Sequence, residues 1–353
     1  MGISNIPASN VTVGVSIISP NRVLGLPRSE FLYPEIPGNT LRDTPCLCFL
    51  IEHHGAHKVT RMLFDLGLPK NIGSAPPAVI DSVQKMNITV ETPKDFSQIL
   101  ADKGLRPSDI DVIIFSHAHF DHIGDLSQFP TTTRLIVGPE FQQKLLPGYP
   151  TDPESAMMEA DLEGRLIGEI DLLNSRIEIN GLHAFDVFQD GSFYILDTAG
   201  HTVGHISALA RTTAPGGEEP SFILLAGDVC HHVGAMRPSP LLRLSQGDVY
   251  KTLNDDIRSN DLIYAMGIHD YMEHPFYLPA IGGFNGNATK MMETLQSIQK
   301  FDADPRVLVV LSHDYWLQKI VPLFPESANR WRENGWLEQV RWQFLKDFEF
   351  SDS

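Results

Sequence analysis

Cysteine is scarce in this sequence, which has only Cys46, Cys48 and Cys230 among its 353 residues. A small, odd number excludes a framework of disulfides and is typical of a reducing compartment, so we expect a cytoplasmic location. Cys46 and Cys48 lie in an apolar run, where strand alternation would place both on one face. Because no second cysteine pair follows, we interpret them as buried thiols and not as a metal-binding C-x-C motif.

Long hydrophobic runs and excess positive charge are also missing. No segment approaches the ~20 apolar residues that span a bilayer, and the first 20 residues show no basic region followed by an apolar one. Lys and Arg number 27 against 44 Asp and Glu, a net charge of −17. Such a field repels phosphate backbones and anionic lipids. We therefore expect a small-molecule substrate, no nucleic-acid partner and no membrane partner; the oligomeric state stays open.

The chain shows no internal repeat, and 42% hydrophobic residues predict a core that folds without metals or disulfides. Strand-like segments in both halves alternate with shorter helical ones. We predict one domain over residues 1–353, with an N-terminal extension at about 1–40, a helical insertion at about 246–301 and a C-terminal helix at about 325–348. The strands are expected at 11–19, 47–52, 59–65, 111–116, 134–137, 175–179, 183–187, 193–197, 206–211, 222–226 and 307–311.

Histidine is the compositional oddity, with 14 copies, several of them beside aspartate. An H-x-H-x-D-H motif follows the apolar strand predicted at residues 111–116; its side chains are those of His117, His119, Asp121 and His122. On one strand the first three would share a face, whereas a strand-to-helix turn at Phe120 would let the two halves face different ions. Ordinary packing explains four such residues poorly, so the motif predicts a metal site.

Further ligand-type residues follow other predicted strands. They are His201 and His205 in G-H-T-V-G-H, Asp228 in A-G-D, and His313 in L-S-H-D. A catalytic zinc needs at least three protein ligands and an open position, so the first cluster serves one ion or parts of two. Together with the turn Phe64-Asp65-x-Gly67, this ordered series resembles the metallo-β-lactamase-fold dizinc hydrolases. It looks most similar to their N-acyl homoserine lactonase-like branch.

The resemblance implies an α+β fold, a four-layer αβ/βα sandwich with two zinc ions per chain in a cleft between the sheets. One zinc would be held by His117, His119 and His201, the second by Asp121, His122 and His313, and Asp228 would bridge them. His205 and Asp65 would support these ligands without binding metal. Histidine and carboxylate ligands without cysteine make hard, Lewis-acidic ions, and two ions ~3.5–4 Å apart can share a hydroxide.

The resemblance does not settle the substrate, because this fold hosts many hydrolases. The negative charge disfavours a nuclease, and the lack of a basic cluster disfavours a glutathione thioester. We expect a lactone ring to be opened by attack of a metal-bridging hydroxide on the carbonyl. The alternatives are a lactamase that hydrolyses a cyclic amide in xenobiotic detoxification, a thioesterase, and a non-catalytic binding protein. The intact ligand set argues against the last.

One departure from the lactonase branch concerns the residue three positions after the bridging aspartate, which is usually tyrosine. Here His231 stands there, and a histidine can donate a proton to a leaving group. Asp121 and His231 are therefore the expected catalytic residues, the alternative being that His231 and His232 only line the cleft. The expected substrate-binding residues, which ordinary packing would also explain, are Phe31, Tyr33, His232 and Tyr271.

Overall fold

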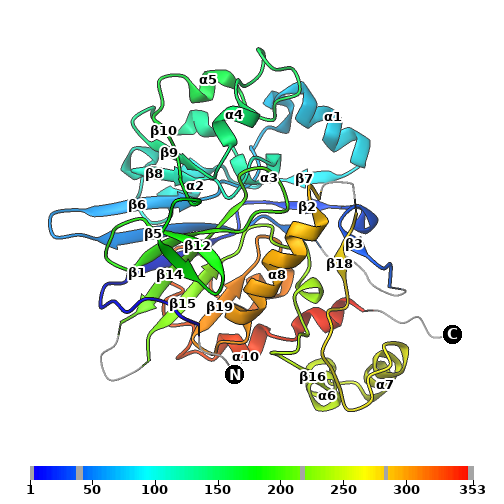
Figure 1. Cartoon of the computed structure of the whole chain (residues 1–353). Coiled ribbons are helices and arrows are strands. Elements are labelled where there is room, and N and C mark those ends of the chain that lie inside the picture. The colour runs from blue at the N-terminus through cyan, green and yellow to red at the C-terminus, as the bar shows by residue number, and fades with distance from the viewer. Residues whose placement is uncertain (1–3, 37–42, 215–218, 282–284, 349–353) are drawn as a thin grey trace.

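Two six-stranded sheets pack face to face, and helices cover their outer faces, so the molecule has four layers (Figure 1). The computed structural model describes residues 4–36, 43–214, 219–281 and 285–348. This architecture confirms the predicted α+β four-layer sandwich.

The first sheet combines an antiparallel edge with a parallel half. Strands β1, β5 and β6 run antiparallel, whereas β6, β8, β9 and β10 are parallel neighbours. The carboxyl ends of the parallel strands therefore meet at one edge of the sheet, where loops can present side chains. In spatial order the strands are β1 (Val13–Ile18), β5 (Cys48–His54), β6 (Val59–Phe64), β8 (Val112–Ile114), β9 (Arg134–Val137) and β10 (Ile167–Glu169).

The second sheet is antiparallel except for its last pair. Strands β15 and β19 are parallel, so both end at the same edge. In spatial order the strands are β11 (Ile177–Ile179), β12 (Leu182–Asp186), β13 (Phe193–Asp197), β14 (Ile206–Thr213), β15 (Ser221–Leu225) and β19 (Val307–Val310).

Apolar side chains from alternate strand positions fill the space between the sheets. Phe49 and Ile114 of the first sheet join Ile195, Ile223 and Val310 of the second in one buried cluster. Each such side chain stabilises the fold by about 1.5–3 kcal/mol relative to an exposed position. Because the two sheets are held rigidly in this way, the loops at their shared edge have fixed relative positions.

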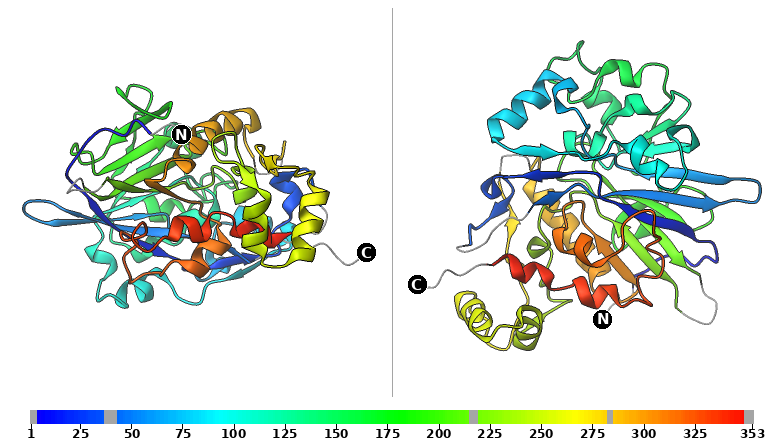
Figure 2. Two further views of the ribbon diagram at one scale, coloured as in Figure 1. Left: turned by 90° about the horizontal axis from the view of Figure 1, so that it is seen from below. Right: turned by 180° about the vertical axis from the view of Figure 1, so that it is seen from behind.

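The helices lie on both outer faces (Figures 1 and 2). Phe96 and Phe141, from α2 and α4, pack on the first sheet, whereas Leu295 and Phe301, from α8, pack on the second. Within the described ranges, no helix is both long and apolar enough to cross a bilayer. The helices are α1 (Pro77–Met86), α2 (Phe96–Ala101), α3 (Phe120–Ile123), α4 (Phe141–Leu145), α5 (Glu159–Leu162), α6 (Gln246–Leu253), α7 (Asp256–Ala265), α8 (Ala288–Asp302), α9 (Tyr315–Ile320) and α10 (Trp336–Val340).

Short strand pairs connect the layers. They are β2 (Arg22–Leu24) with β4 (Thr44–Pro45) and β7 (Thr89–Glu91), β3 (Leu32–Tyr33) with β18 (Leu278–Pro279), and β16 (Leu244–Ser245) with β17 (Tyr271–Met272).

Two segments expected as additions contribute to the core. Strand β1, within the expected extension 1–40, is an edge strand of the first sheet. Helix α8, within the expected insertion 246–301, buries Leu295 and Ile298 against the second sheet. Helices α6 and α7 of the same segment instead project from one end of the molecule (Figure 1).

The C-terminal segment is less helical than predicted. Within residues 325–348 only α10 is an α-helix, followed by a 3₁₀ helix at Gln343–Asp347. The Asn329 side chain accepts from the Val15 N–H at 2.8 Å and donates to the Val13 carbonyl at 2.8 Å, which ties this segment to β1. Such side-chain bonds to backbone compete with helix formation. The prediction of one long helix was therefore wrong.

Candidate metal centre

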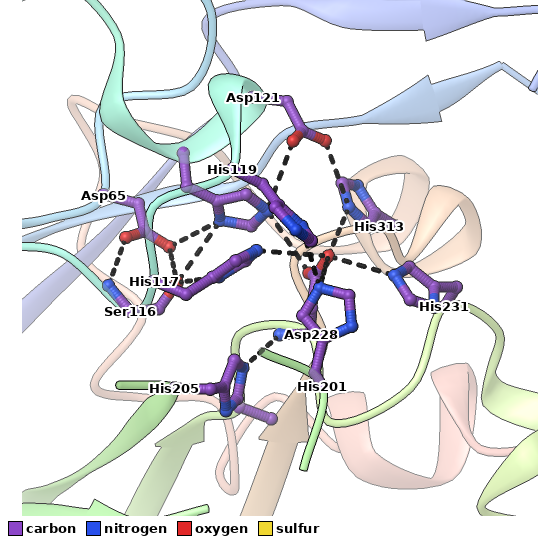
Figure 3. A network of polar contacts seen from close by, with 12 residues as sticks. Asp65, Ser116, His117, His119, Asp121, His201, His205, Asp228, His231 and His313 are labelled. Carbon is purple, nitrogen blue, oxygen red and sulfur yellow. Dashed lines mark hydrogen bonds and ion pairs between the residues drawn. The ribbon is translucent and has the colours of Figure 1, made fainter. Parts of the chain in front are cut away.

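All seven side chains expected to bind metal converge at the edge shared by the two sheets (Figure 3). Each comes from a segment that follows a strand, so the rigid sheets fix their relative positions. His117, His119, Asp121 and His122 follow β8 and enter α3, His201 follows β13, Asp228 follows β15, and His313 follows β19.

Asp228 lies at the middle of the cluster. Its Oδ1 is 3.4 Å from His122 Nε2, and its Oδ2 is 3.2 Å from His313 Nε2. The same Oδ2 is 3.8 Å from His201 Nε2 and 4.0 Å from His117 Nε2. The carboxylate thus faces the histidines of both expected metal sites, which is the position a bridging ligand would need.

The first ligand group consists of His117, His119 and His201. Their ligand atoms lie within 4.8 Å of one another, and His201 Nε2 is 3.0 Å from His119 Nδ1. Three histidines with no carboxylate among them match the three-histidine type of catalytic zinc site, in which a fourth position stays open.

The second ligand group contains the expected Asp121, His122 and His313. Asp121 Oδ2 is 3.5 Å from His313 Nε2, and Asp121 Oδ1 is 3.9 Å from His122 Nε2. Cys46 also belongs here, because its thiol lies within 4.8 Å of ligand atoms of Asp121 and His313. From the sequence, Cys46 was interpreted as a buried thiol and not as part of a metal-binding C-x-C motif, because no second cysteine pair follows it.

The donor set fits divalent metal ions. His117 Nε2, His122 Nε2 and Asp228 Oδ1 are buried, face the centre and have no hydrogen-bond partner among the described residues. Nearly all buried polar atoms in proteins are paired, so three such atoms in one cluster fit a bound cation. Imidazole and carboxylate donors are those that zinc accepts.

A buried carboxylate orients the second group from behind. Asp65 Oδ2 lies 2.9 Å from His122 Nδ1, and its carboxylate also accepts from the Ser116 N–H and hydroxyl, both at 2.7 Å. With its Nδ1–H bound in this way, His122 presents the lone pair of Nε2 to the centre. Asp65 itself contributes to none of the ligand groups found among the described residues.

His205 is fully engaged in the scaffold. Its Nε2 accepts from the Asp228 N–H at 2.9 Å, so Nδ1 carries the proton that it donates to the Thr198 carbonyl at 2.9 Å. Neither ring nitrogen is left for a metal, as the sequence analysis expected. His205 instead holds the backbone of Asp228, the residue whose carboxylate faces both ligand groups.

Burial sets the protonation of the first group. It lowers the pKa of His119 to about 4 and those of His117 and His201 well below their ordinary value, with neighbouring histidines adding to the shift at the last two. All three are therefore neutral near pH 7 and ready to bind metal.

The second group behaves differently. Burial acts to lower the pKa values of His122 and His313, but the surrounding acidic groups, Asp228 first and Asp121 with it, together outweigh burial and raise both pKa values well above the ordinary value. These two histidines must therefore release protons to bind metal, which makes metal binding at this group pH-dependent.

An apolar cavity of about 180 Å³ opens onto the cluster. Helix α1 supplies one wall and the segment around β2 another, while metal-type residues form the base. No lysine or arginine is among its described lining residues, so the cavity suits an uncharged, apolar molecule. The lining residues are Val23, Leu26, Phe31, Ala78, Val79, Ser82, Met86, Ala118, His119, Phe120, Asp121, Glu154, Ala156, Asp228, His231 and His313.

Two of the remaining predicted site residues lie at this cavity. His231 Nε2 is 3.3 Å from Asp228 Oδ2, and the ring of His231 contacts that of Phe31 with centroids 4.5 Å apart. Phe31 is 8% exposed and lines the same wall. The structure therefore brings His231 and Phe31 together with the metal-type residues.

The other predicted substrate residues lie elsewhere. Tyr33 is 64% exposed and does not line the cavity. His232 lines a smaller neighbouring cavity, where its Nε2 is 3.2 Å from Asp347 Oδ2. The side chain of Tyr271 lies outside the described part of the structure.

Helix α1 is the part of the site that the sequence analysis missed. A usable signal was present: Pro77 occupies the first turn, and Asn87 ends the helix with a φ of 53°. Proline at a helix start and asparagine in the left-handed conformation at its end are typical helix boundaries.

Comparison with known proteins gives a consistent result. The family model described as Metallo-beta-lactamase superfamily matches residues 41–210. Gamma-lactamase FDB1 of Fusarium pseudograminearum is 37% identical over 350 residues, 97% of this chain and 84% of that protein. Metallo-hydrolase mfmC of Annulohypoxylon moriforme is 37% identical over 349 residues, 97% of this chain and 89% of that protein.

A solved structure supports the fold. An AiiA variant of B. thuringiensis with N-decanoyl-L-homoserine bound at its active site has a TM-score of 0.58, covering 90% of this chain and 99% of that one. At 17% identity, this likeness concerns the arrangement of the backbone alone.

Proposed function

Because the chain belongs to the metallo-β-lactamase superfamily and is a metal-dependent hydrolase, we propose that it uses two zinc ions to open a γ-lactam or the related γ-lactone. The observation that carries the proposal is the convergence of two ligand groups on Asp228 at the base of an apolar cavity. His117, His119 and His201 would hold one ion, Asp121, His122 and His313 the other, and Asp228 would contact both.

Two bound zinc ions supply a water of lowered pKa and a Lewis acid for the carbonyl. The protein itself orients the side chains that would bind the metal ions, and it supplies a proton to the leaving group. His122 is oriented by Asp65, and Asp228 is fixed through its backbone N–H by His205. Asp121, on the first turn of α3 and expected from the sequence to be catalytic, would also orient the attacking water.

His231 is the reason to favour an amide over an ester as the bond that is hydrolysed. It lines the cavity with its Nε2 directed at the cluster. An amide nitrogen leaves poorly unless it is protonated, and an imidazole can supply that proton near neutral pH. The sequence analysis placed a lactone first; the relative named gamma-lactamase, at 37% identity over most of both chains, moves the lactam ahead.

The cavity indicates the kind of substrate. Its wall of apolar side chains and the absence of lysine and arginine among the described lining residues favour an uncharged ring with an apolar or aromatic substituent. Phe31 would pack against that substituent. The three cysteines are all buried and unpaired, which supports a reducing compartment, and we propose a cytoplasmic location.

The direct test is hydrolysis of a matched panel: a γ-lactam, a γ-lactone and an acyclic thioester that carry the same aromatic substituent. We expect both rings to be opened by the zinc-loaded protein and neither by protein stripped with a chelator. Hydrolysis of the thioester alone would make the chain a thioesterase, and no hydrolysis of any member by protein with two bound zinc ions would contradict the proposal.

A further inference from the structure

Cys46 lies beside the second ligand group, although from the sequence we interpreted it as a buried thiol. Its thiol is within 4.8 Å of ligand atoms of both Asp121 and His313, and the residue is 1% exposed. Among the described residues, the centre contains one group of three histidines, two groups of histidine with Asp228, and this one group that contains a thiol.

The backbone holds Cys46 against His313. His313 Nδ1 donates to the Pro45 carbonyl at 2.7 Å, and the Leu47 N–H donates to the Ser312 carbonyl at 2.8 Å. The residues on both sides of Cys46 are therefore bound to the loop that carries His313. Once His313 has released one proton to bind metal, the first bond keeps the remaining proton on Nδ1 and leaves the lone pair of Nε2 directed at the centre.

An independent observation supports a metal ion at this group. His122 is 1% exposed, and its Nε2 has no hydrogen-bond partner among the described residues. That atom faces the carboxylates of Asp121 and Asp228, at 3.9 and 3.4 Å. A buried nitrogen that has no hydrogen bond and faces two carboxylates is an arrangement that a bound cation would complete.

The other two cysteines differ from Cys46. Cys48 is fully buried, its thiol donates to the Cys46 carbonyl at 3.6 Å, and it packs with Ile18 and Leu63. Cys230 is 2% exposed and belongs to the apolar cluster around the second sheet. Neither contributes to a ligand group among the described residues.

We propose that Cys46 binds the second metal ion as a thiolate, which makes this site a mixed carboxylate, histidine and thiolate site. The inference rests on the proposed dinuclear centre and adds a ligand to it. It departs from the expected hard set of histidine and carboxylate, because thiolate is a soft donor that favours zinc over manganese or magnesium. Cys46 would lose its proton on binding, as thiol ligands do.

The test uses the full-length protein, stripped of metal and reloaded with cobalt(II). Cobalt bound to a thiolate absorbs in the near ultraviolet by charge transfer from sulfur, whereas cobalt bound only to nitrogen and oxygen does not. We expect this band in the wild type when two equivalents of cobalt are bound. X-ray absorption of the zinc form should show a sulfur neighbour at about 2.3 Å.

Serine variants of the three cysteines identify which of them supplies the sulfur ligand. Cys46→Ser should remove the band and weaken binding of the second ion by about 10–100-fold or more, the range known even for residues that only support a ligand. Cys48→Ser and Cys230→Ser should keep both the band and the affinity. A band that survives in Cys46→Ser and disappears in Cys230→Ser would overturn the assignment.

The cobalt spectrum and the X-ray absorption of the wild-type protein test the role of Cys46 even if a variant does not fold. Two bound cobalt ions without the charge-transfer band, and two zinc ions without a sulfur neighbour, would overturn the role of Cys46 and leave the proposed function standing. Failure to bind two ions at all would overturn both.

Discussion

The metal centre and the wall of the cavity are built in different ways. The centre uses side chains at the ends of β8, β15 and β19, each in a rigid sheet, and His117 and Asp228 are 1% and 2% exposed. The wall comes from α1 and the segment around β2, which line the cavity mostly with apolar side chains. The sheets therefore hold the metal-type side chains in fixed positions. Residues of the wall can be replaced, and substrate preference altered, without moving those side chains.

The strongest test of this comparison removes the residue at the middle of the centre. Asp228→Ala should lower kcat/KM by about 10⁴-fold or more, as for groups on which a whole catalytic unit depends. Circular dichroism should show an intact fold, because the core lies between the sheets. Glu154→Gln, which changes an acid of the cavity outside the ligand groups, should stay within a few-fold of wild type. Near-normal activity of Asp228→Ala would show that Asp228 does not bridge.

His231 lies where centre and wall meet. His231→Phe should lower turnover by about 10²–10⁴-fold, the range for a general acid, and more for a lactam than for an activated lactone. His232→Gln is the control, because His232 faces Asp347 in the neighbouring cavity. Turnover of His231→Phe equal to that of wild type on every substrate would restrict His231 to lining the cavity.

Asp65, which orients His122 without binding metal, is expected to have a smaller effect than Asp228 or His231 when it is replaced. Asp65→Asn removes the carboxylate that orients His122, and it should weaken metal binding by about 10–100-fold. Titration of the stripped protein with zinc in the presence of a competing chelator measures this change. Unchanged affinity would mean that His122 needs no partner at Nδ1.

The wall should alter substrate choice but not chemistry. Val79 is 4% exposed and lines the cavity from α1. Val79→Phe should raise KM about tenfold for a substrate with a bulky substituent and leave kcat on a compact one nearly unchanged. Gln84→Ala, on the exposed side of α1, is the control. A fall in kcat on the compact substrate would contradict the separation of wall and centre.

The smallest effect concerns stability and pH. Burial lowers the pKa of His205 to about 4, below the value near 6.5 of the unfolded chain. The unfolded state therefore binds one more proton between these values, so the stabilisation is complete above pH 6.5 and is lost as the pH falls toward 4.

Urea unfolding of metal-free protein at pH 6.5 and 5 measures this loss. The free energy of unfolding of the wild type should fall by about 1.4 kcal/mol per pH unit more than that of His205→Asn. Parallel pH profiles for the two proteins would show that His205 is not held neutral.

The contrast between the metal centre and the wall of the cavity also explains which features could be predicted from the sequence. The strands at 134–137 and 193–197 were predicted at their observed bounds, because apolar runs between turn residues mark buried strands. The seven metal-type residues were found because they follow such strands in short motifs. Helix α1 had local boundary signals at Pro77 and Asn87, but its place beside the cavity was not found, and neither was the proximity of Cys46 to His313, since both depend on packing between segments far apart in the sequence.

Zinc titration with activity as the readout tests the central claim most directly. Metal-free protein should show no hydrolysis of a γ-lactam or γ-lactone, and activity should reach its maximum when two zinc ions are bound per chain. Full activity without metal, or a maximum at one bound ion that a second does not change, would contradict the dinuclear centre.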